Sequence, residues 1–242
     1  ELAPPFRRHN VIRSMSSRRL VVLLGSLSAM ASASVFARSR CAMHPETYHM
    51  RGAREPKHSD KYVIVDATTM HRANSLHEGE ASDLALRIAD VVNWAYRGGK
   101  RDSSASRAWT TEQHLLSGIR TTPAAVENMI RNACQQGPKE RALFLAQLAG
   151  TDSADPDSNV VGTVHVERCG GDSNEAEIGL LSVDPSLQGS GIGGTLLRAA
   201  ERHALSAMGC RKAVLWVISS RADLRAWYEG SCGYTATGET AP

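Results

Sequence analysis

The sequence has few of the features that indicate a metal site, a redox site or a membrane span. None of its cysteines forms a C-x-x-C pair, and the nine histidines are dispersed, His44 and His49 lying five apart without clear ligand geometry. The cysteines are Cys41, Cys134, Cys169, Cys210 and Cys232. The main apolar stretch, residues 20–30, is too short and too rich in Ser and Gly to span a bilayer. We therefore predict ordinary thiols, no metal site and no stable membrane span.

The chain also lacks a strong overall charge. Its net charge is +3, but residues 1–60 hold ten Lys and Arg against four Asp and Glu, leaving 18 against 21 for the remainder. The basic excess is therefore confined to the N-terminal part, and the body is mildly acidic. This balance argues against a nucleic-acid-binding surface. An apolar content of 42% is enough for a packed core and excludes global disorder.

Residues 1–60 resemble a targeting segment. Starting at Met15, a short basic head is followed by the apolar stretch 20–30 and by small residues over 31–37, which is the order of a secretory signal peptide. The same region is rich in Arg and Ser and has no acidic residue between Glu1 and Glu46, which suits an organellar transit peptide equally well. Residues 38–60 show no periodicity and are interpreted as linker.

We therefore expect a targeting presequence with a disordered linker over residues 1–60 and one folded domain over 61–242. The favoured destination is an organelle, a plastid or a mitochondrion. The cytoplasm and the secretory route are the alternatives, and an extension without any address also remains open.

Hydrophobic periodicity over residues 61–242 predicts alternating strands and helices. Strands are expected at 62–68, 142–148, 160–167, 176–183, 213–219 and 234–238. Helices are expected at 80–96, around Leu115 and Leu116, from the Thr122-Pro123 start to about 137, at 191–208 and at 222–230. This order predicts an α/β fold in the mixed α+β sense, with helices on both faces of a mixed sheet.

The glycine-rich turn Gln188-Gly189-Ser190-Gly191-Ile192-Gly193-Gly194 joins the strand 176–183 to the next helix. Gly189, Gly191 and Gly194 fit the dinucleotide-binding pattern G-x-G-x-x-G, but residues 184–188 intervene after the strand and the next strand ends in Ser219-Ser220 instead of an acid. A nucleotide-hydrolase phosphate loop would need a Lys before Thr195, which is absent. Both of these assignments are therefore excluded. A turn of this kind still suits a pyrophosphate, because free N–H groups at a helix N-terminus are directed at the ligand.

Two linked segments resemble motifs of the GNAT acetyltransferases. The string Gln188-x-x-Gly191-x-Gly193, which follows Val183-Asp184-Pro185, resembles motif A of this family. The string Ala226-Trp227-Tyr228-Glu229, followed by Tyr234, resembles motif B at the family spacing. The resemblance covers about residues 61–240, and residues 109–121 are similar to a poorly characterised branch of the family.

The resemblance implies a GNAT fold, a central mixed and mostly antiparallel sheet that is splayed between the motif A strand and the next strand. It implies acetyl-CoA as the co-substrate, with the backbone of Leu181 and Val183 contacting the pantetheine arm. The pyrophosphate would be bound by Gln188, Gly189, Ser190, Gly191, Ile192, Gly193 and Gly194. Ser220 and Arg221 follow the strand where many members carry an Asn, so we expect Arg221 to contact a phosphate instead.

The resemblance also implies direct attack of a primary amine on the thioester in a ternary complex. Tyr228 is the expected acid for the departing thiolate, the alternative being a Tyr that only packs in the core. Glu177 is the expected base, acting through a water, with Glu112 and Glu239 as weaker alternatives.

We thus expect an acetyl-CoA-dependent N-acetyltransferase. A small-molecule amine is slightly favoured as acceptor over a protein Lys or N-terminus. The alternative is a catalytically silent acyl-CoA-binding module. The sequence gives no indication of oligomeric state.

Overall fold

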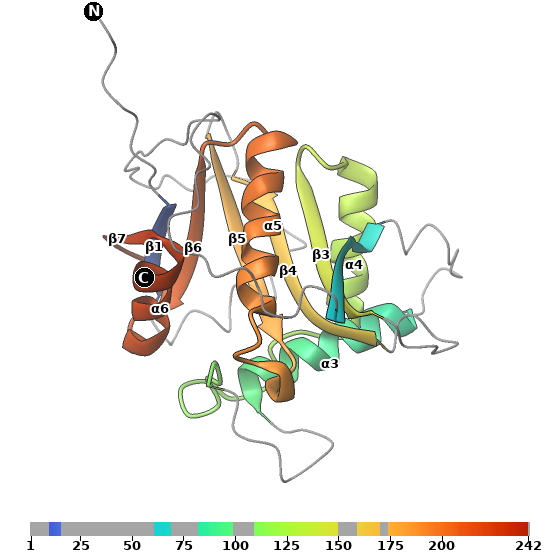
Figure 1. Ribbon diagram of the computed structural model, residues 1–242, viewed down its shortest axis with the longest axis horizontal. Helices are drawn as coiled ribbons and strands as arrows, with labels where there is room; N and C mark the ends of the chain where they lie inside the picture. The colour runs from blue at the N-terminus through green and yellow to red at the C-terminus, as the bar shows by residue number, and fades with distance from the viewer. Residues whose placement is uncertain are drawn as a thin grey trace, which may run out of the picture.

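The computed structural model describes residues 10–15, 61–68, 82–98, 109–149, 159–169 and 174–241. They form a seven-stranded sheet in the order β2-β3-β4-β5-β6-β1-β7 (Figure 1). The strands are β1 (Asn10–Met15), β2 (Tyr62–Asp66), β3 (Arg141–Leu148), β4 (Val160–Arg168), β5 (Glu175–Val183), β6 (Lys212–Ile218) and β7 (Tyr234–Ala241).

The strands β2 to β5 pair antiparallel, whereas β5 and β6 pair parallel. The part of the sheet from β2 to β6 is therefore mixed and mostly antiparallel, as the sequence analysis predicts. The strand β4 lies in the middle of this half and is buried over most of its length. Its run of Val residues suits a strand that is covered on both faces.

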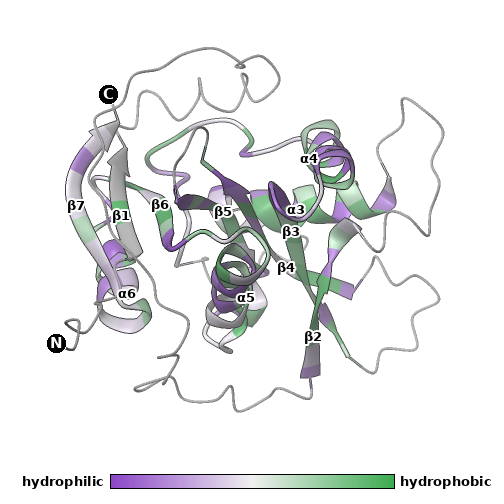
Figure 2. Cartoon of the chain, turned by 90° about the horizontal axis from the view of Figure 1, so that it is seen from above, coloured by the Kyte–Doolittle hydropathy of each residue, from purple (hydrophilic) through white to green (hydrophobic). Residues whose placement is uncertain are grey.

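Helices cover both faces of the sheet, which confirms the predicted fold class (Figure 2). The helix α5 (Ile192–Ser206) packs on one face, and the helices α3 (Asp83–Arg97) and α4 (Pro123–Gln136) pack on the other. The helix α6 (Ala222–Cys232) lies beside β7.

Local sequence signals set the starts of α3 and α4. The Ser82 hydroxyl accepts from the Ala85 N–H at 3.1 Å, and the Thr122 hydroxyl accepts from the Ala125 N–H at 3.1 Å, with Pro123 in the first turn of α4. Such caps satisfy N–H groups that have no partner within the helix. The prediction of a helix around Leu115 and Leu116 is wrong, because the structure has only a turn there.

The strands β5 and β6 diverge after a short paired stretch. Their register pairs are Glu175 with Lys212, Ala176 with Ala213 and Glu177 with Val214, although both strands continue beyond this point. A buried ion pair fixes the closed end, where Lys212 Nζ lies 2.8 Å from Glu175 Oε1. The predicted splay is confirmed.

A backbone irregularity lies in the diverging part of β5. Leu180 has a φ of +50°, which is rare for a residue with a side chain, and the β4–β5 register shifts between Thr163 and His165. Such a bulge redirects the strand locally, so it marks the stretch of β5 where a ligand has room to approach the backbone.

The strand β1 is an element that the sequence analysis missed. It lies within residues 1–60, expected to be presequence and linker, yet it pairs parallel with β6 and with β7. The side chain of Ile12 is 3% exposed and belongs to the core cluster on the α5 side. Residues 16–60 lie outside the described part of the chain, so the proposed presequence and linker there stay predictions. No helix among the described residues is long and apolar enough to cross a membrane.

The burial of Ile12 makes the position of β1 testable. Replacing Ile12 with Ala should lower the free energy of unfolding by about 2–4 kcal/mol, because a buried aliphatic side chain is lost. Denaturant unfolding measures this change. The matched control is Val63→Ala on β2, whose side chain is 49% exposed and which should change stability by less than about 0.5 kcal/mol. Equal effects of the two substitutions would show that β1 is not part of the folded sheet.

Candidate active site

The glycine turn between β5 and α5 has the geometry of an anion site. Gly189 and Gly191 have φ values of +83° and +92°, in the left-handed region that favours glycine. The helix α5 begins at Ile192 without a side-chain hydrogen bond at its N-cap. Its first N–H groups are therefore available to a ligand, at the positive end of the helix dipole. A Cβ built at Gly189 would meet nothing within 4 Å, so the backbone of the turn is open to close approach. The turn therefore fits a pyrophosphate.

Arg198 adds a cation beside this turn. Its Nη1 lies 3.4 Å from the Cβ position of Gly194, and its Nη2 donates to the Thr195 hydroxyl at 3.0 Å. The sequence analysis did not identify Arg198. The available signal was its spacing of four from Gly194, which places both residues on one face of the helix.

The side chain of Gln188 holds a neighbouring segment instead of facing the open side of the turn. Its Nε2 donates to the Thr110 hydroxyl at 3.0 Å and to the Val183 carbonyl at 3.2 Å, and its Oε1 accepts from the Trp109 N–H at 3.1 Å. These contacts tie residues 109–110 to the end of β5. The expected cofactor contact of Gln188 thus remains a prediction for its backbone.

Arg221 is buried and its five N–H groups are all engaged. It forms two hydrogen bonds with the Asp223 carboxylate, at 2.9 and 3.0 Å. It also donates to the carbonyls of Trp109, Thr110 and Thr111, at 3.0, 2.9 and 3.2 Å. A guanidinium has five donors, so none remains for a phosphate. The expected phosphate contact of Arg221 is therefore corrected: this residue joins the start of α6 to residues 109–111.

Ser220 lies next to Arg221 in an exposed turn between β6 and α6. Its expected contact with the cofactor stays a prediction.

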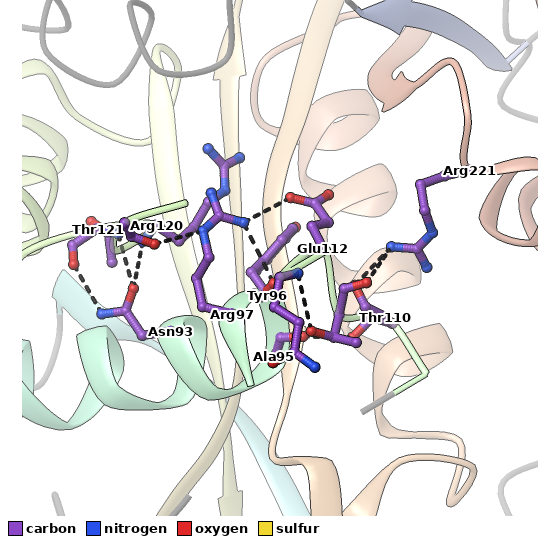
Figure 3. A network of polar contacts seen from close by, with 12 residues as sticks. Asn93, Ala95, Tyr96, Arg97, Thr110, Glu112, Arg120, Thr121 and Arg221 are labelled. Atoms are coloured by element: carbon purple, nitrogen blue, oxygen red, sulfur yellow. Dashed lines mark hydrogen bonds and ion pairs between the residues drawn. The ribbon is translucent and has the colours of Figure 1, made fainter. Parts of the chain in front are cut away.

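Residues 109–112 also contact the end of α3. The Thr110 hydroxyl donates to the Ala95 carbonyl at 3.1 Å, and the Glu112 N–H donates to the Tyr96 carbonyl at 2.7 Å. The Glu112 carboxylate is buried and lies 3.1 Å from Arg97 Nη1. Figure 3 shows these contacts, with Arg221 reaching Thr110 from the α6 side. The short stretch 109–112, here called the bridging segment, thus connects α3, α6 and the glycine turn.

Tyr228 lies on α6 among aromatic rings. Its ring centroid is 4.8 Å from that of Trp227 and 5.6 Å from that of Tyr234. Burial raises the pKa of Tyr228 well above its ordinary value, and the negative charges that Tyr96 and Glu112 can carry act in the same direction. Its hydroxyl therefore stays protonated at neutral pH. Unlike the hydroxyls of Tyr96 and Tyr234, this hydroxyl forms no hydrogen bond with any described residue.

Tyr96 connects the surroundings of Tyr228 to the diverging part of β5. Its hydroxyl donates to the Leu181 carbonyl at 3.3 Å. The side chain packs against the core cluster under α3, on the face opposite α5. The sequence analysis did not identify Tyr96, since an aromatic residue at helical spacing carries no signal beyond core packing. The predicted roles of the Leu181 and Val183 backbone toward pantetheine stay predictions.

Glu177 lies at the last paired position of β5 and β6. Its Oε2 accepts from the Trp216 indole N–H at 3.1 Å. Trp216 in turn packs against a small apolar cluster that includes Leu116 and Ile218. A Cβ built at Gly179, two residues further along β5, would meet nothing within 4 Å. The carboxylate of Glu177 is thus held near open space at the start of the splay.

Among the described residues there is no group of three or more His, Cys, Asp or Glu side chains that could hold a metal ion. Cys41, His44 and His49 lie outside this part of the chain. The expectation of no metal site is not tested further and stays a prediction.

Comparisons with known proteins point to one family. Residues 121–234 match the model of the acetyltransferase (GNAT) family. This range contains α4, the glycine turn, the splayed strands and Tyr228. A search of curated proteins finds no match.

Several solved structures are similar to the chain at low sequence identity. The glucosamine-6-phosphate N-acetyltransferase of Arabidopsis thaliana is 14% identical, with 75% of this chain and 96% of that chain covered and a TM-score of 0.46. The PaiA N-acetyltransferase of Thermoplasma acidophilum, in complex with coenzyme A, is 19% identical, with 70% and 87% covered and a TM-score of 0.44. AAC(6')-Iy in complex with the bisubstrate analogue CoA-S-monomethyl-acetylneamine is 14% identical, with 75% and 95% covered and a TM-score of 0.45.

The assignment rests on the family model and on the agreement of the splay, the glycine turn and the motif spacing with it. Residues 121–234 therefore form a GNAT acetyltransferase domain, and this match supports an N-acetyltransferase enzyme.

Proposed function

We propose that the protein transfers the acetyl group of acetyl-CoA to a primary amine by direct attack in a ternary complex, and that the acceptor is a small molecule. The bridging segment supports a small acceptor. Its bonds to Arg221, Gln188 and α3 hold this segment against the end of β5, and we infer that it limits the room for a large partner. A protein Lys or N-terminus is the second choice of acceptor.

The observation that carries the mechanism is the state of the Tyr228 hydroxyl. It is protonated, because burial of the side chain among aromatic rings raises its pKa, and it forms no hydrogen bond within the described part of the chain. The hydroxyl oxygen is not among the enclosed polar atoms that lack a partner, so it is open to a ligand. A departing thiolate at this position would accept its proton.

The proposed reaction has two proton transfers, and Glu177 takes part in the first. Glu177 removes a proton from the acceptor ammonium through a water, which leaves a neutral amine. Trp216 holds the carboxylate in place through its indole N–H.

Tyr228 takes part in the second transfer. Acetyl-CoA supplies the thioester, whose C–S bond breaks as the new C–N bond forms. Tyr228 gives its proton to the sulfur and recovers one from the amine nitrogen as the amide forms. The products are the N-acetylated acceptor and free CoA, and no covalent enzyme intermediate is needed.

We also propose an organellar destination, a plastid or a mitochondrion, on the basis of the composition of residues 1–60. The cytoplasm and the secretory route are the alternatives. Cleavage of the chain at any point beyond Met15 would also remove β1. The proposal therefore requires that the rest of the sheet stays folded without β1. Microscopy of the full chain fused at its C-terminus to a fluorescent protein distinguishes these destinations.

Tyr228→Phe removes the proposed acid and keeps the ring. We expect kcat to fall about 10²-fold or more, because general acid catalysis contributes about that much. The affinity for acetyl-CoA should stay unchanged. Steady-state release of free CoA with a panel of amines, together with calorimetric titration of acetyl-CoA, measures both quantities. An unchanged kcat would remove Tyr228 from the role of acid.

Gly191→Val tests the glycine turn. Gly191 has a φ of +92°, which a β-branched residue adopts only with strain, and the new side chain would occupy the proposed phosphate position. Binding of CoA should fall by about 100-fold or more, as measured by calorimetry. The control is Gly230→Ala, at a helical glycine where an added Cβ meets nothing within 4 Å. If CoA still bound to a folded Gly191→Val protein with wild-type affinity, the turn would not be the phosphate site.

Glu177→Gln tests the proposed base. It keeps the shape and the acceptor oxygen for Trp216 but removes the negative charge. We expect kcat/KM for the amine to fall about 10²-fold, with acetyl-CoA affinity unchanged. Trp216→Phe, which removes the orienting N–H together with part of the ring but leaves the carboxylate, should have a smaller effect. If Glu177→Gln kept full activity, Glu112 would become the next candidate base. Tight acetyl-CoA binding by the wild type, with no turnover of any amine, would instead favour a silent acyl-CoA-binding module.

A further inference from the structure

Among the described residues near the end of α3, the cluster of Arg97, Arg120 and Glu112 carries one more positive charge than negative charge. The Glu112 carboxylate is matched by Arg97, at 3.1 Å and with both side chains largely buried. Arg97 also donates to the Gly118 carbonyl at 2.9 Å and to the Tyr96 carbonyl at 3.4 Å. The second cation of this group, Arg120, forms no ion pair with any carboxylate of the described residues.

Arg120 is held in position by its backbone. Its N–H and that of Thr121 both donate to the Asn93 Oδ1, at 2.7 and 3.2 Å, and Asn93 Nδ2 donates to the Thr121 carbonyl at 2.9 Å. Figure 3 shows Asn93 between α3 and this segment. The position of the guanidinium is therefore set by the fold and not by a counter-ion.

The guanidinium of Arg120 lies over the ring of Tyr96, with its central carbon 4.9 Å from the ring centroid. Its Nε is fully enclosed and has no hydrogen-bond partner. The Tyr96 ring attracts the cation. Burial raises the pKa of Tyr96, and Arg120 opposes this rise through its charge and a side-chain hydrogen bond. No carboxylate of the described residues balances this partly buried charge, so the guanidinium is expected to meet an anion in the working protein.

The location relates this cation to the acceptor side of the site. Tyr96, over which Arg120 lies, donates to the Leu181 carbonyl in the diverging part of β5. Tyr96 packs on the α3 face of the sheet, whereas the glycine turn begins α5 on the other face. An anion at Arg120 is therefore separate from a pyrophosphate at the turn. The cluster of Arg97, Glu112 and Arg120 has a net charge of +1, which a single carboxylate balances better than a doubly charged phosphate.

We propose that Arg120 binds a carboxylate of the acceptor, so that the substrate class is an amine that also carries a carboxylate, such as an amino acid. This inference rests on the proposed function, because it assigns the acceptor of the same site. The planar guanidinium matches a carboxylate through two parallel hydrogen bonds. Glu177 and Arg120 would then engage the two ends of the acceptor, the ammonium and the carboxylate.

The experiment compares amino acids with their carboxamides as acceptors. Each pair keeps the amine and replaces only the carboxylate by a neutral group. Release of free CoA from acetyl-CoA gives kcat and KM for the wild type, for Arg120→Gln and for Arg202→Gln, a control at an exposed arginine of α5. We expect the wild type to prefer at least one carboxylate over its carboxamide by about 10- to 100-fold in kcat/KM, as for a hydrogen-bonded charge.

Arg120→Gln should abolish this preference mainly by raising KM for the carboxylate. Activity on the carboxamides, CoA affinity and melting temperature should stay at the Arg202→Gln values. Equal use of carboxylates and carboxamides by the wild type would overturn the inference and leave the proposed transfer intact. An equal loss on both classes in Arg120→Gln, or a loss of CoA affinity, would also overturn it.

If no amine in the panel accelerates CoA release, the proposed acetyl transfer to these acceptors fails, and this result alone does not decide whether Arg120 binds a carboxylate. Calorimetric titration of the amino acids into the CoA-loaded protein then tests Arg120 on its own. Saturable binding of a carboxylate that is lost in Arg120→Gln would support the carboxylate site, and absence of such binding would overturn it.

Discussion

The divergence of β5 from β6 is the constraint on which the other parts of the site depend. The two strands pair only over Glu175–Glu177, and the buried Lys212–Glu175 ion pair fixes the closed end. Beyond that point the backbone groups of β5 that face β6 have no neighbouring strand. A polar backbone edge inside a protein requires partners. In the proposed complex the cofactor arm would supply such partners at this gap in the sheet.

The bridging segment joins elements on different sides of this gap. Residues 109–112 contain no helix or strand, yet several of their backbone groups are bonded by Arg221, Gln188 and α3. A loop without regular structure depends on side chains for such hydrogen bonds. Arg221 is therefore more informative as a structural residue than as a phosphate ligand. It couples the loop to the helix that carries Tyr228, so the cofactor turn and the proposed acid share one support.

In the proposed complex, the two faces of the sheet would provide two kinds of charge recognition. On the α5 face, free N–H groups at the helix start and the nearby Arg198 provide positive potential for phosphates. On the α3 face, Arg97, Arg120 and Glu112 form a compact cluster with one unmatched positive charge. The splay lies between these faces. An acceptor and a cofactor can therefore reach the same gap from opposite sides without competing for the same charges.

The sequence by itself determined most of the elements from β2 to β7 and the position of the glycine turn, because these depend on local signals. Gly189 and Gly191 lie in the turn between β5 and α5 that the sequence predicts, and Thr122-Pro123 begins α4 as predicted. Tertiary structure decided which side chains meet. Arg221 was assigned to a phosphate, although three of its five hydrogen bonds go to a loop some 110 positions away in the sequence and the other two go to Asp223. The position of β1 and the unmatched charge of Arg120 were equally invisible, since each depends on segments distant in sequence. Local conformation is encoded in neighbouring residues, whereas charge balance and strand order are properties of the folded chain.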